Sequence, residues 1–313
     1  MSSNADRLVV ILSPPRSFSS VACAMLGQHP ELYGVAETHL LAAETVGEWW
    51  GMCAEAGFPM ADGLLRTIAE LLFGGQAEAT VRRAELWLRN RPDLACADVL
   101  RLLAERVQPR TLIEKSPVLV YRVEWMQRVA ANFPNVRFIH LTRHPRGHAY
   151  SVAKHIRESR KFGQTPGWLV NLGWLEEDGR TLGRDYDPQR SWYALNRNID
   201  SFLAILPRDR WLRVRGEDLL ADPDRYLREI ASWLDVRTDA DAIARMKHPE
   251  RSPFATIGPP GAWYGNDLFF LRDPQLRSRS DEAHDLEAPL EWRRDGAGFH
   301  PEVKTLARKF GYP

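Results

Sequence analysis

Small hydroxyl residues surround one arginine at positions 13–20, between an aliphatic run and a helix-like stretch. The run Leu8–Leu12 is continuously apolar, which is typical of a central parallel strand buried on both faces. The segment after it therefore places Ser19, Ser20 and backbone N–H groups at the start of a helix, where anions bind. Arg16 adds a permanent charge whose planar guanidinium suits a phosphate or sulfonate group. An ordinary turn, in which the serines only cap the helix, explains the pattern equally well.

A second cationic motif follows another β-prone run, at residues 136–141. Arg143 comes directly after this run, and Ser151 stands eight positions later in a helix-like stretch. A fixed cation and a hydroxyl at one strand-to-helix turn can converge on one dianion, although a lone arginine there is more often an ordinary surface residue. Two anion sites at the carboxyl edge of neighbouring strands suit a nucleotide with phosphates at both its 3′ and 5′ positions, which ATP does not have.

The letters Pro-Arg-Ser-Phe-Ser-Ser at positions 15–20, followed by His29 and Pro30, resemble the start of the sulfotransferases that use 3′-phosphoadenosine 5′-phosphosulfate (PAPS). The tyrosylprotein and heparan sulfate branches, and the bacterial polyketide-associated sulfotransferases, are the most similar in motif. In the first two branches a catalytic Glu follows the His-Pro step, and Glu37 stands at that place. The resemblance implies that Glu37 is a general base and that PAPS contacts the loop residues Arg16, Ser17, Phe18, Ser19 and Ser20.

One loop position departs from the resemblance, because these sulfotransferases usually have Gly where this chain has Phe18. We expect the loop either to take a backbone conformation that Phe tolerates or to open differently.

Further residues are implied by the same resemblance. The letters Glu-Lys-Ser-Pro at 114–117 are similar to the family's Lys-Ser/Thr-Pro element, which places Lys115 near the transferring group. Arg16 and Lys115 would stabilise the charge on the leaving oxygen, and Arg143 and Ser151 would bind the 3′-phosphate. Alone, Lys115 would be interpreted as a solvated residue in a turn.

Three other residues enter as candidates in less defined roles. His39 could orient Glu37, contact the acceptor or serve as the base itself, or it could be structural. Arg251 and Arg277 lie in the segment where the family closes over the nucleotide, and they are weaker candidates for contacts with the 3′-phosphate.

The chain is expected to fold as one sulfotransferase domain, 1–313, of the α/β class, with a P-loop-type parallel sheet flanked by helices. Strands are predicted at residues 8–12, 111–113, 136–141 and 211–214. Helical periodicity predicts a helical insertion at about 42–107. Two segments rich in Gly, Pro and aromatic residues, at about 163–188 and 248–277, are predicted lids.

Composition limits the partners. The 42 basic and 41 acidic residues give a formal charge of +1, which favours neither nucleic acid nor a membrane as partner.

The three cysteines are widely spaced, and the polar start of the chain does not resemble a signal peptide, so we expect reduced thiols and a cytoplasmic protein. The histidines near Arg143 do not have a zinc-like spacing, so no metal site is predicted. The oligomeric state is open.

The predicted function is transfer of the PAPS sulfonate to a hydroxyl, with release of 3′-phosphoadenosine 5′-phosphate (PAP). The chain has eleven Trp, and the helical insertion and lid segments contain several aromatic residues: Trp49, Trp50, Trp168, Trp174, Trp263 and Tyr264. They suggest an apolar or aromatic small-molecule acceptor from natural-product chemistry, although Trp also fills cores. A variant of this predicted function is sulfation that activates a hydroxyl for elimination. The alternatives are a P-loop nucleotide kinase or NTPase, which would need Mg²⁺ and a Gly-Lys-Ser/Thr loop that the chain lacks, and a non-catalytic nucleotide-binding protein.

Overall fold

The computed structural model describes residues 7–56, 59–161, 187–277, 285–293 and 295–313. These residues form a parallel sheet of five strands in the order β2-β3-β1-β4-β5. The strands are β1 (Leu8–Leu12), β2 (Leu32–Gly34), β3 (Thr111–Lys115), β4 (Arg137–Thr142) and β5 (Trp211–Arg215). The predicted α/β class and parallel sheet are confirmed.

The central strand β1 is apolar throughout because both of its faces are covered. Leu8, Val10 and Leu12 belong to one hydrophobic core, whereas Val9 and Ile11 belong to a second core on the other face of the sheet. All five side chains are almost fully buried. The continuous run in the sequence therefore reflects two helical layers rather than one.

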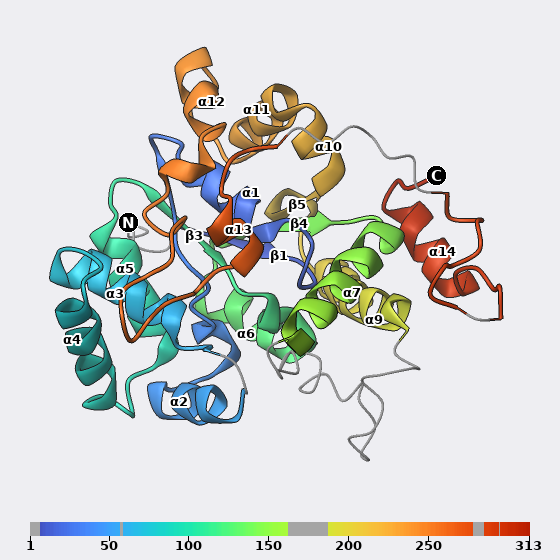
Figure 1. Ribbon diagram of the computed structural model, residues 1–313. Coiled ribbons are helices and arrows are strands. Elements are labelled where there is room, and N and C mark those ends of the chain that lie inside the picture. Colours follow the sequence, from blue (N-terminus) through green and yellow to red (C-terminus); the bar gives the residue numbers. More distant parts are fainter. Residues whose placement is uncertain (1–6, 57–58, 162–186, 278–284, 294) are drawn as a thin grey trace.

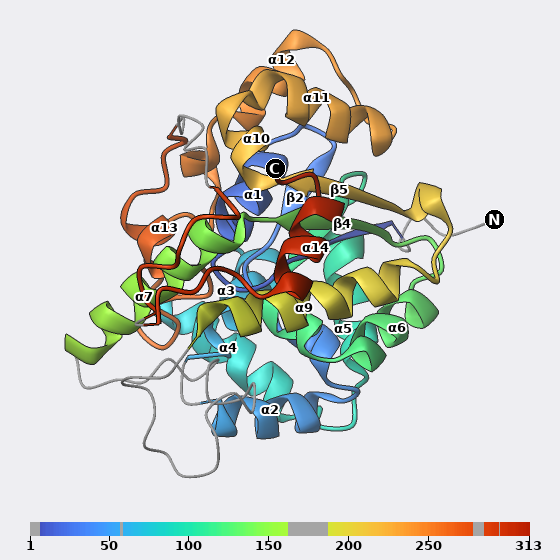
Figure 2. The same ribbon diagram turned by 90° about the vertical axis from the view of Figure 1, so that its right-hand side faces the viewer.

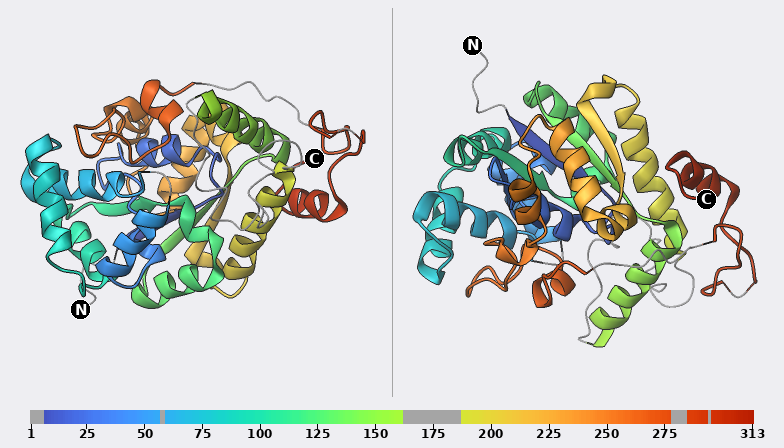
Figure 3. Two further views of the ribbon diagram at one scale, coloured as in Figure 1. Left: turned by 60° about the horizontal axis from the view of Figure 1, so that its bottom comes forward. Right: turned by 90° about the horizontal axis from the view of Figure 1, so that it is seen from above.

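Helices cover the two faces of the sheet (Figure 1). One face carries α1 (Ser19–Leu26), α10 (Gly216–Ala221), α11 (Pro223–Trp233) and α12 (Ala240–Met246). The other face carries α5 (Cys96–Arg106), α6 (Val123–Asn132) and α9 (Pro188–Leu203). The C-terminal helix α14 (Pro301–Lys309) packs against α9 at the periphery, as Figure 3 shows.

The stretch predicted to be helical contains α2 (Val46–Glu55), α3 (Asp62–Phe73), α4 (Glu78–Arg89) and α5. In Figure 1 these helices gather at the left of the molecule, opposite α14. The assignment of residues 1–313 to one domain stays a prediction.

The short strand β2 was not predicted from the sequence. It has three residues and ends in Gly34, so it carries no apolar pattern of useful length. Gly34 is required by close packing, because a Cβ on it would lie 2.6 Å from the carbonyl oxygen of Cys23 in α1. The strand lies under α1 and leads toward Glu37.

The first predicted lid, 163–188, lies almost entirely outside the described residues. The second, 248–277, contains the 3-10 helix η5 (Pro249–Arg251) and α13 (Leu268–Arg272), and α13 lies beside α7 (Pro145–Lys161) in Figure 2. Its middle is anchored on α3, where the buried Arg66 donates from Nη1 to the carbonyl of Tyr264 at 2.6 Å. Gly265, with φ 95°, approaches Gly63 so closely that a Cβ would lie 2.5 Å from the Gly63 Cα.

Candidate active site

Segments from the carboxyl edge of the sheet surround a cavity of about 730 Å³. Ligands of parallel α/β sheets bind at this edge, and the volume is ordinary for a small-molecule site. Ten of the residues nominated from the sequence line the cavity: Arg16, Ser17, Phe18, Ser19, Ser20, Glu37, His39, Arg143, Ser151 and Arg277. Lys115 lies directly behind this lining, and it is fully buried.

The loop between β1 and α1 has an unusual backbone. Arg16 has φ 70° and Phe18 has φ 65°, both in the left-handed region, with Ser17 between them at negative φ. Alternation of this kind aims successive N–H groups at one point, as in anion-binding backbone nests. Phe18 therefore keeps the loop in a left-handed conformation that glycine enters freely and an aromatic residue rarely enters.

The serines of this loop support an anion site. Ser17 is 1% exposed, and its Oγ has no hydrogen-bond partner among the described residues. The N-cap position of α1, occupied by Phe18, provides no side-chain cap to the helix. A buried hydroxyl without a partner costs free energy, and a ligand oxygen in the cavity would remove that cost. The loop therefore fits a phosphate or sulfonate.

Arg16 is held by an internal carboxylate. Its guanidinium forms an ion pair with Asp267 at the start of α13, and its Nε donates to the Oγ of Ser151 at 3.2 Å. Burial lowers the pKa of Arg16 to about 10, opposed by attraction to Glu37, so the side chain stays charged at neutral pH. Sequence reasoning missed Asp267, whose only signal was its place in the second predicted lid.

Arg143 lies close to the same loop. Its Nη1 donates to the carbonyl of Arg16 at 2.7 Å, and its own carbonyl accepts from Trp192 Nε1 at 2.7 Å. Since Ser151 also contacts Arg16, the two cationic motifs of the sequence meet in space. We call Arg16, Ser17, Arg143 and Ser151 the cationic wall of the cavity.

Glu37, Lys115 and His39 form a second cluster. Lys115 Nζ donates to Glu37 Oε1 and, at 2.9 Å, to Ser20 Oγ, while His39 Nε2 lies 3.6 Å from Glu37 Oε2. Burial raises the pKa of Glu37, but attraction to Lys115 and a hydrogen bond from His39 outweigh it and lower this pKa to about 2. Glu37 is therefore an ionised carboxylate at neutral pH, paired with a buried cation.

The end of β3 fixes the backbone around Glu37. Thr38 Oγ1 donates to Glu114 Oε1 at 2.8 Å, Ser116 Oγ donates to the same oxygen, and the His39 N–H donates to Ser116 Oγ at 2.8 Å. Burial raises the pKa of Glu114, against the effect of these hydrogen bonds. The sequence analysis missed Glu114 as a support, although a carboxylate inside a buried strand is a signal for one.

Part of the cavity lining is apolar. Met60, Val118 and Tyr121 belong to one hydrophobic cluster, and they line the cavity beside Pro59 and Pro117. We call Met60, Val118 and Tyr121 the apolar wall.

Within the described residues, none of the tryptophans named from the sequence lines the cavity. Trp49 is fully buried in the main core, and Trp263 is 51% exposed. Trp168 and Trp174 lie outside the described residues. Tyr264, from the second predicted lid, does line the cavity.

The two weaker arginine candidates are placed differently. Arg277 lines the rim of the cavity, where it pairs with Asp273 and its side chain is 76% exposed. Arg251 is exposed in η5 and is not among the residues that line the cavity.

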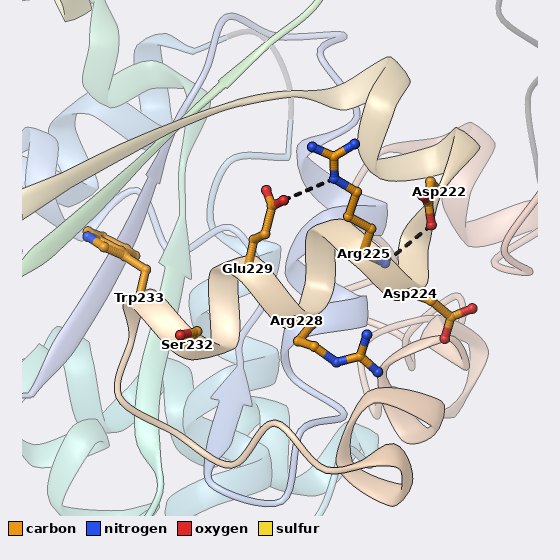
Figure 4. A pocket seen from close by; sticks show the side chains of 7 residues that line it. All are labelled: Asp222, Asp224, Arg225, Arg228, Glu229, Ser232 and Trp233. Carbon is orange, nitrogen blue, oxygen red and sulfur yellow. Dashed lines mark hydrogen bonds and ion pairs between the residues drawn. The ribbon is translucent and has the colours of Figure 1, made fainter.

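A second hollow lies over the outer face of α11 (Figure 4). Two ion pairs lie on it: Arg225 Nε is 3.0 Å from Glu229, and Asp224 is 2.9 Å from Lys247. Figure 4 shows these side chains along a single helix, so the hollow lacks the converging strands of the main cavity.

The described residues contain neither a metal-binding cluster nor a membrane-spanning helix. In this part of the chain, no group of three or more His, Cys, Asp or Glu side chains is arranged to hold a metal ion. No helix among the same residues is long and apolar enough to span a membrane.

Comparison with known proteins identifies the class. A family model described as "Sulfotransferase family" matches residues 9–240, so the chain belongs to the sulfotransferase family and is a sulfotransferase enzyme. The sulfotransferase domain of the Synechococcus PCC 7002 olefin synthase shares the fold, with a TM-score of 0.71, 24% identity and coverage of 98% of this chain and 94% of that one. The sulfotransferase domain from the curacin biosynthetic pathway gives a TM-score of 0.66, 22% identity and coverage of 97% of each chain. No curated protein matched in sequence.

Proposed function

We propose that this sulfotransferase takes its sulfonate from PAPS and transfers it to the hydroxyl of a small apolar molecule. The observation that supports this most strongly is the convergence of two cationic motifs and a Glu–Lys pair on one cavity. Each motif alone has an ordinary explanation, but these explanations do not account for the contacts of Arg16 with Ser151 and with Arg143, which join the two motifs.

The cationic wall would hold the two ends of the donor. The loop N–H groups, the Ser17 hydroxyl and Arg16 suit the 5′-phosphosulfate. Arg143 and Ser151 suit the 3′-phosphate, because a guanidinium can bind two oxygens of one phosphate. The buried Ser17 Oγ gains a partner in this arrangement.

In the proposed reaction, the acceptor oxygen bonds to sulfur while the bond from sulfur to the 5′-phosphate oxygen breaks, and PAP leaves with the electron pair. Arg16 and Lys115 would stabilise the charge on that oxygen, at a few kcal/mol for each well-placed donor. Glu37 would accept the acceptor's proton, which contributes on the order of 10²–10⁴-fold to the rate. His39 would orient Glu37, which lies 3.6 Å from its Nε2.

The pairing of Lys115 with Glu37 affects the order in which the donor binds and Glu37 becomes an effective base. While Lys115 contacts Glu37, the pKa of Glu37 is about 2, and such a carboxylate is a weak base. A bound phosphosulfate would attract Lys115 toward itself, and the pKa of Glu37 would then rise. We therefore expect the donor to bind before the base becomes effective.

The acceptor would lie between Glu37 and the apolar wall. Met60, Val118 and Tyr121 favour an apolar body with a neutral hydroxyl over a charged glycan. A natural-product acceptor and a cytoplasmic location stay predictions.

Calorimetric titration of the purified protein with PAP and with ATP·Mg²⁺ tests the donor. Tighter binding of PAP without any requirement for Mg²⁺ would support the proposal. Preference for ATP·Mg²⁺ would overturn it in favour of phosphoryl transfer.

A further inference from the structure

Phe18 occupies a backbone conformation that is unfavourable for a bulky residue. Its φ of 65° and ψ of 9° are left-handed, a region that glycine enters freely and aromatic residues rarely enter. Such a conformation persists where the surrounding structure over-determines it, commonly at ligand sites. The side chain of Phe18 therefore needs an explanation of its own.

The ring of Phe18 has a defined seat. It packs on Gly216, the first residue of α10, so closely that a Cβ on Gly216 would overlap with Cδ2 of the ring. Gly216 follows β5, the strand next to the one that precedes Arg143. The missing side chain at position 216 thus makes room for the extra side chain at position 18.

The same ring supports the Arg143 guanidinium. The Cζ of Arg143 lies 4.2 Å from the centroid of the Phe18 ring, within the range of a cation–π contact. Nη1 of Arg143 is also fixed, by the carbonyl of Arg16 at 2.7 Å. Two residues of the β1–α1 loop therefore determine where this guanidinium points.

We propose that Phe18 is a positioning residue, whose ring, seated on Gly216, holds the Arg143 guanidinium in the orientation that receives the 3′-phosphate of the donor. This inference rests on the proposed function. The loop that binds the 5′ end would thereby also build the site for the 3′ end. The glycine usual at this position in similar sulfotransferases has no ring to provide this support.

The test compares two nucleotides that differ only in the 3′-phosphate, PAP and AMP, by calorimetry. We expect Phe18→Leu and Phe18→Gly to weaken PAP binding about three- to tenfold, the size of a lost cation–π contact, and AMP binding less than twofold. Phe18→Tyr, which keeps an aromatic face, should keep the ratio of the two affinities. The melting temperature of each variant is measured alongside.

A substitution at Gly216 tests the contact between Gly216 and the Phe18 ring independently. Gly216→Ala should displace the ring and cause a similar selective loss in the wild-type background. In the Phe18→Gly background the added methyl meets no ring and lies only against the Thr142 carbonyl oxygen, at 3.2 Å, so the same substitution should have a much smaller further effect on PAP binding. This non-additivity would show that the two positions act through one contact.

The outcomes separate the inference from the proposed function. If Arg143→Ala abolishes the preference for PAP while Phe18→Leu and Phe18→Gly leave it intact, the role of Phe18 is wrong and the donor site stands. If Phe18→Leu weakens PAP and AMP equally and lowers the melting temperature, Phe18 is only structural. If Arg143→Ala leaves the preference unchanged, the proposed 3′-phosphate site itself fails.

Discussion

The two walls of the cavity are built in different ways. The cationic wall comes from short motifs directly after β1 and β4, where the chain order of a few residues sets the geometry. The apolar wall combines Met60 with Val118 and Tyr121 of the 3-10 helix η3 (Pro117–Tyr121), and no short motif in the sequence indicated that these residues would meet. The comparison teaches that each half of the donor side is encoded in a short motif and the fold brings the two halves together, whereas the acceptor side has no such motif and is defined by packing alone.

Glu37 is the proposed general base, and its loss should have the largest effect. Glu37→Gln keeps the shape but cannot accept a proton, so turnover should fall on the order of 10²–10⁴-fold, while the affinity for PAP stays within about threefold because the cationic wall is intact. Steady-state kinetics and calorimetry measure the two quantities. Glu229→Gln, on the exposed hollow of α11, is the matched control. A Glu37→Gln enzyme with full turnover would remove the base assignment.

The dependence of stability on pH tests whether ionised Glu37, paired with Lys115, stabilises the folded protein. Its pKa is lowered from 4.5 to about 2, so the stability that it contributes is fully present above pH 4.5 and is lost as the pH falls toward 2. The loss amounts to up to about 3 kcal/mol. Chemical denaturation between pH 5 and pH 2 should therefore show a shallower decline for Glu37→Gln than for the wild type. Parallel declines would mean that the Lys115 pairing does not stabilise the fold.

A substitution of Asp267 tests whether its carboxylate competes with the donor for Arg16. Asp267→Asn keeps the N-cap of α13 but removes the carboxylate that pairs with Arg16. We expect PAP to bind about three- to tenfold more tightly, because a charge-assisted contact no longer has to be broken. Asp224→Asn, whose partner is Lys247 on the exposed hollow, should leave PAP binding unchanged. Weaker binding in Asp267→Asn would show instead that Asp267 orients Arg16 for the ligand.

The smallest effect is expected on the apolar wall. Val118→Thr keeps the shape but places a hydroxyl against apolar neighbours, so the KM for an aromatic alcohol such as 2-naphthol should rise about fivefold, with PAP affinity unchanged. Kinetics with 2-naphthol as the varied substrate measure this. An unchanged KM together with weaker PAP binding would show that Val118 contacts the donor rather than the acceptor.

The sequence predicted the sheet better than the site. The strand β1 has the predicted bounds, because an apolar run buried on both faces is a strong signal, and β3, β4 and β5 lie within two residues of theirs. The three-residue β2 had no such signal. Asp267 and Glu114 act through partners distant in the chain, and the tryptophan count did not show that Trp49 would fill the core.

The ratio of the affinities for PAP and AMP, in the wild type and in Arg143→Ala, tests the central claim most directly. The account predicts that the wild type binds PAP at least about tenfold more tightly than AMP, because Arg143 and Ser151 meet the 3′-phosphate with charge-assisted hydrogen bonds. Arg143→Ala should lose most of this preference while its affinity for AMP changes little, and Arg228→Ala, exposed on α11, should keep it. Equal affinities for PAP and AMP in the wild type would contradict the account.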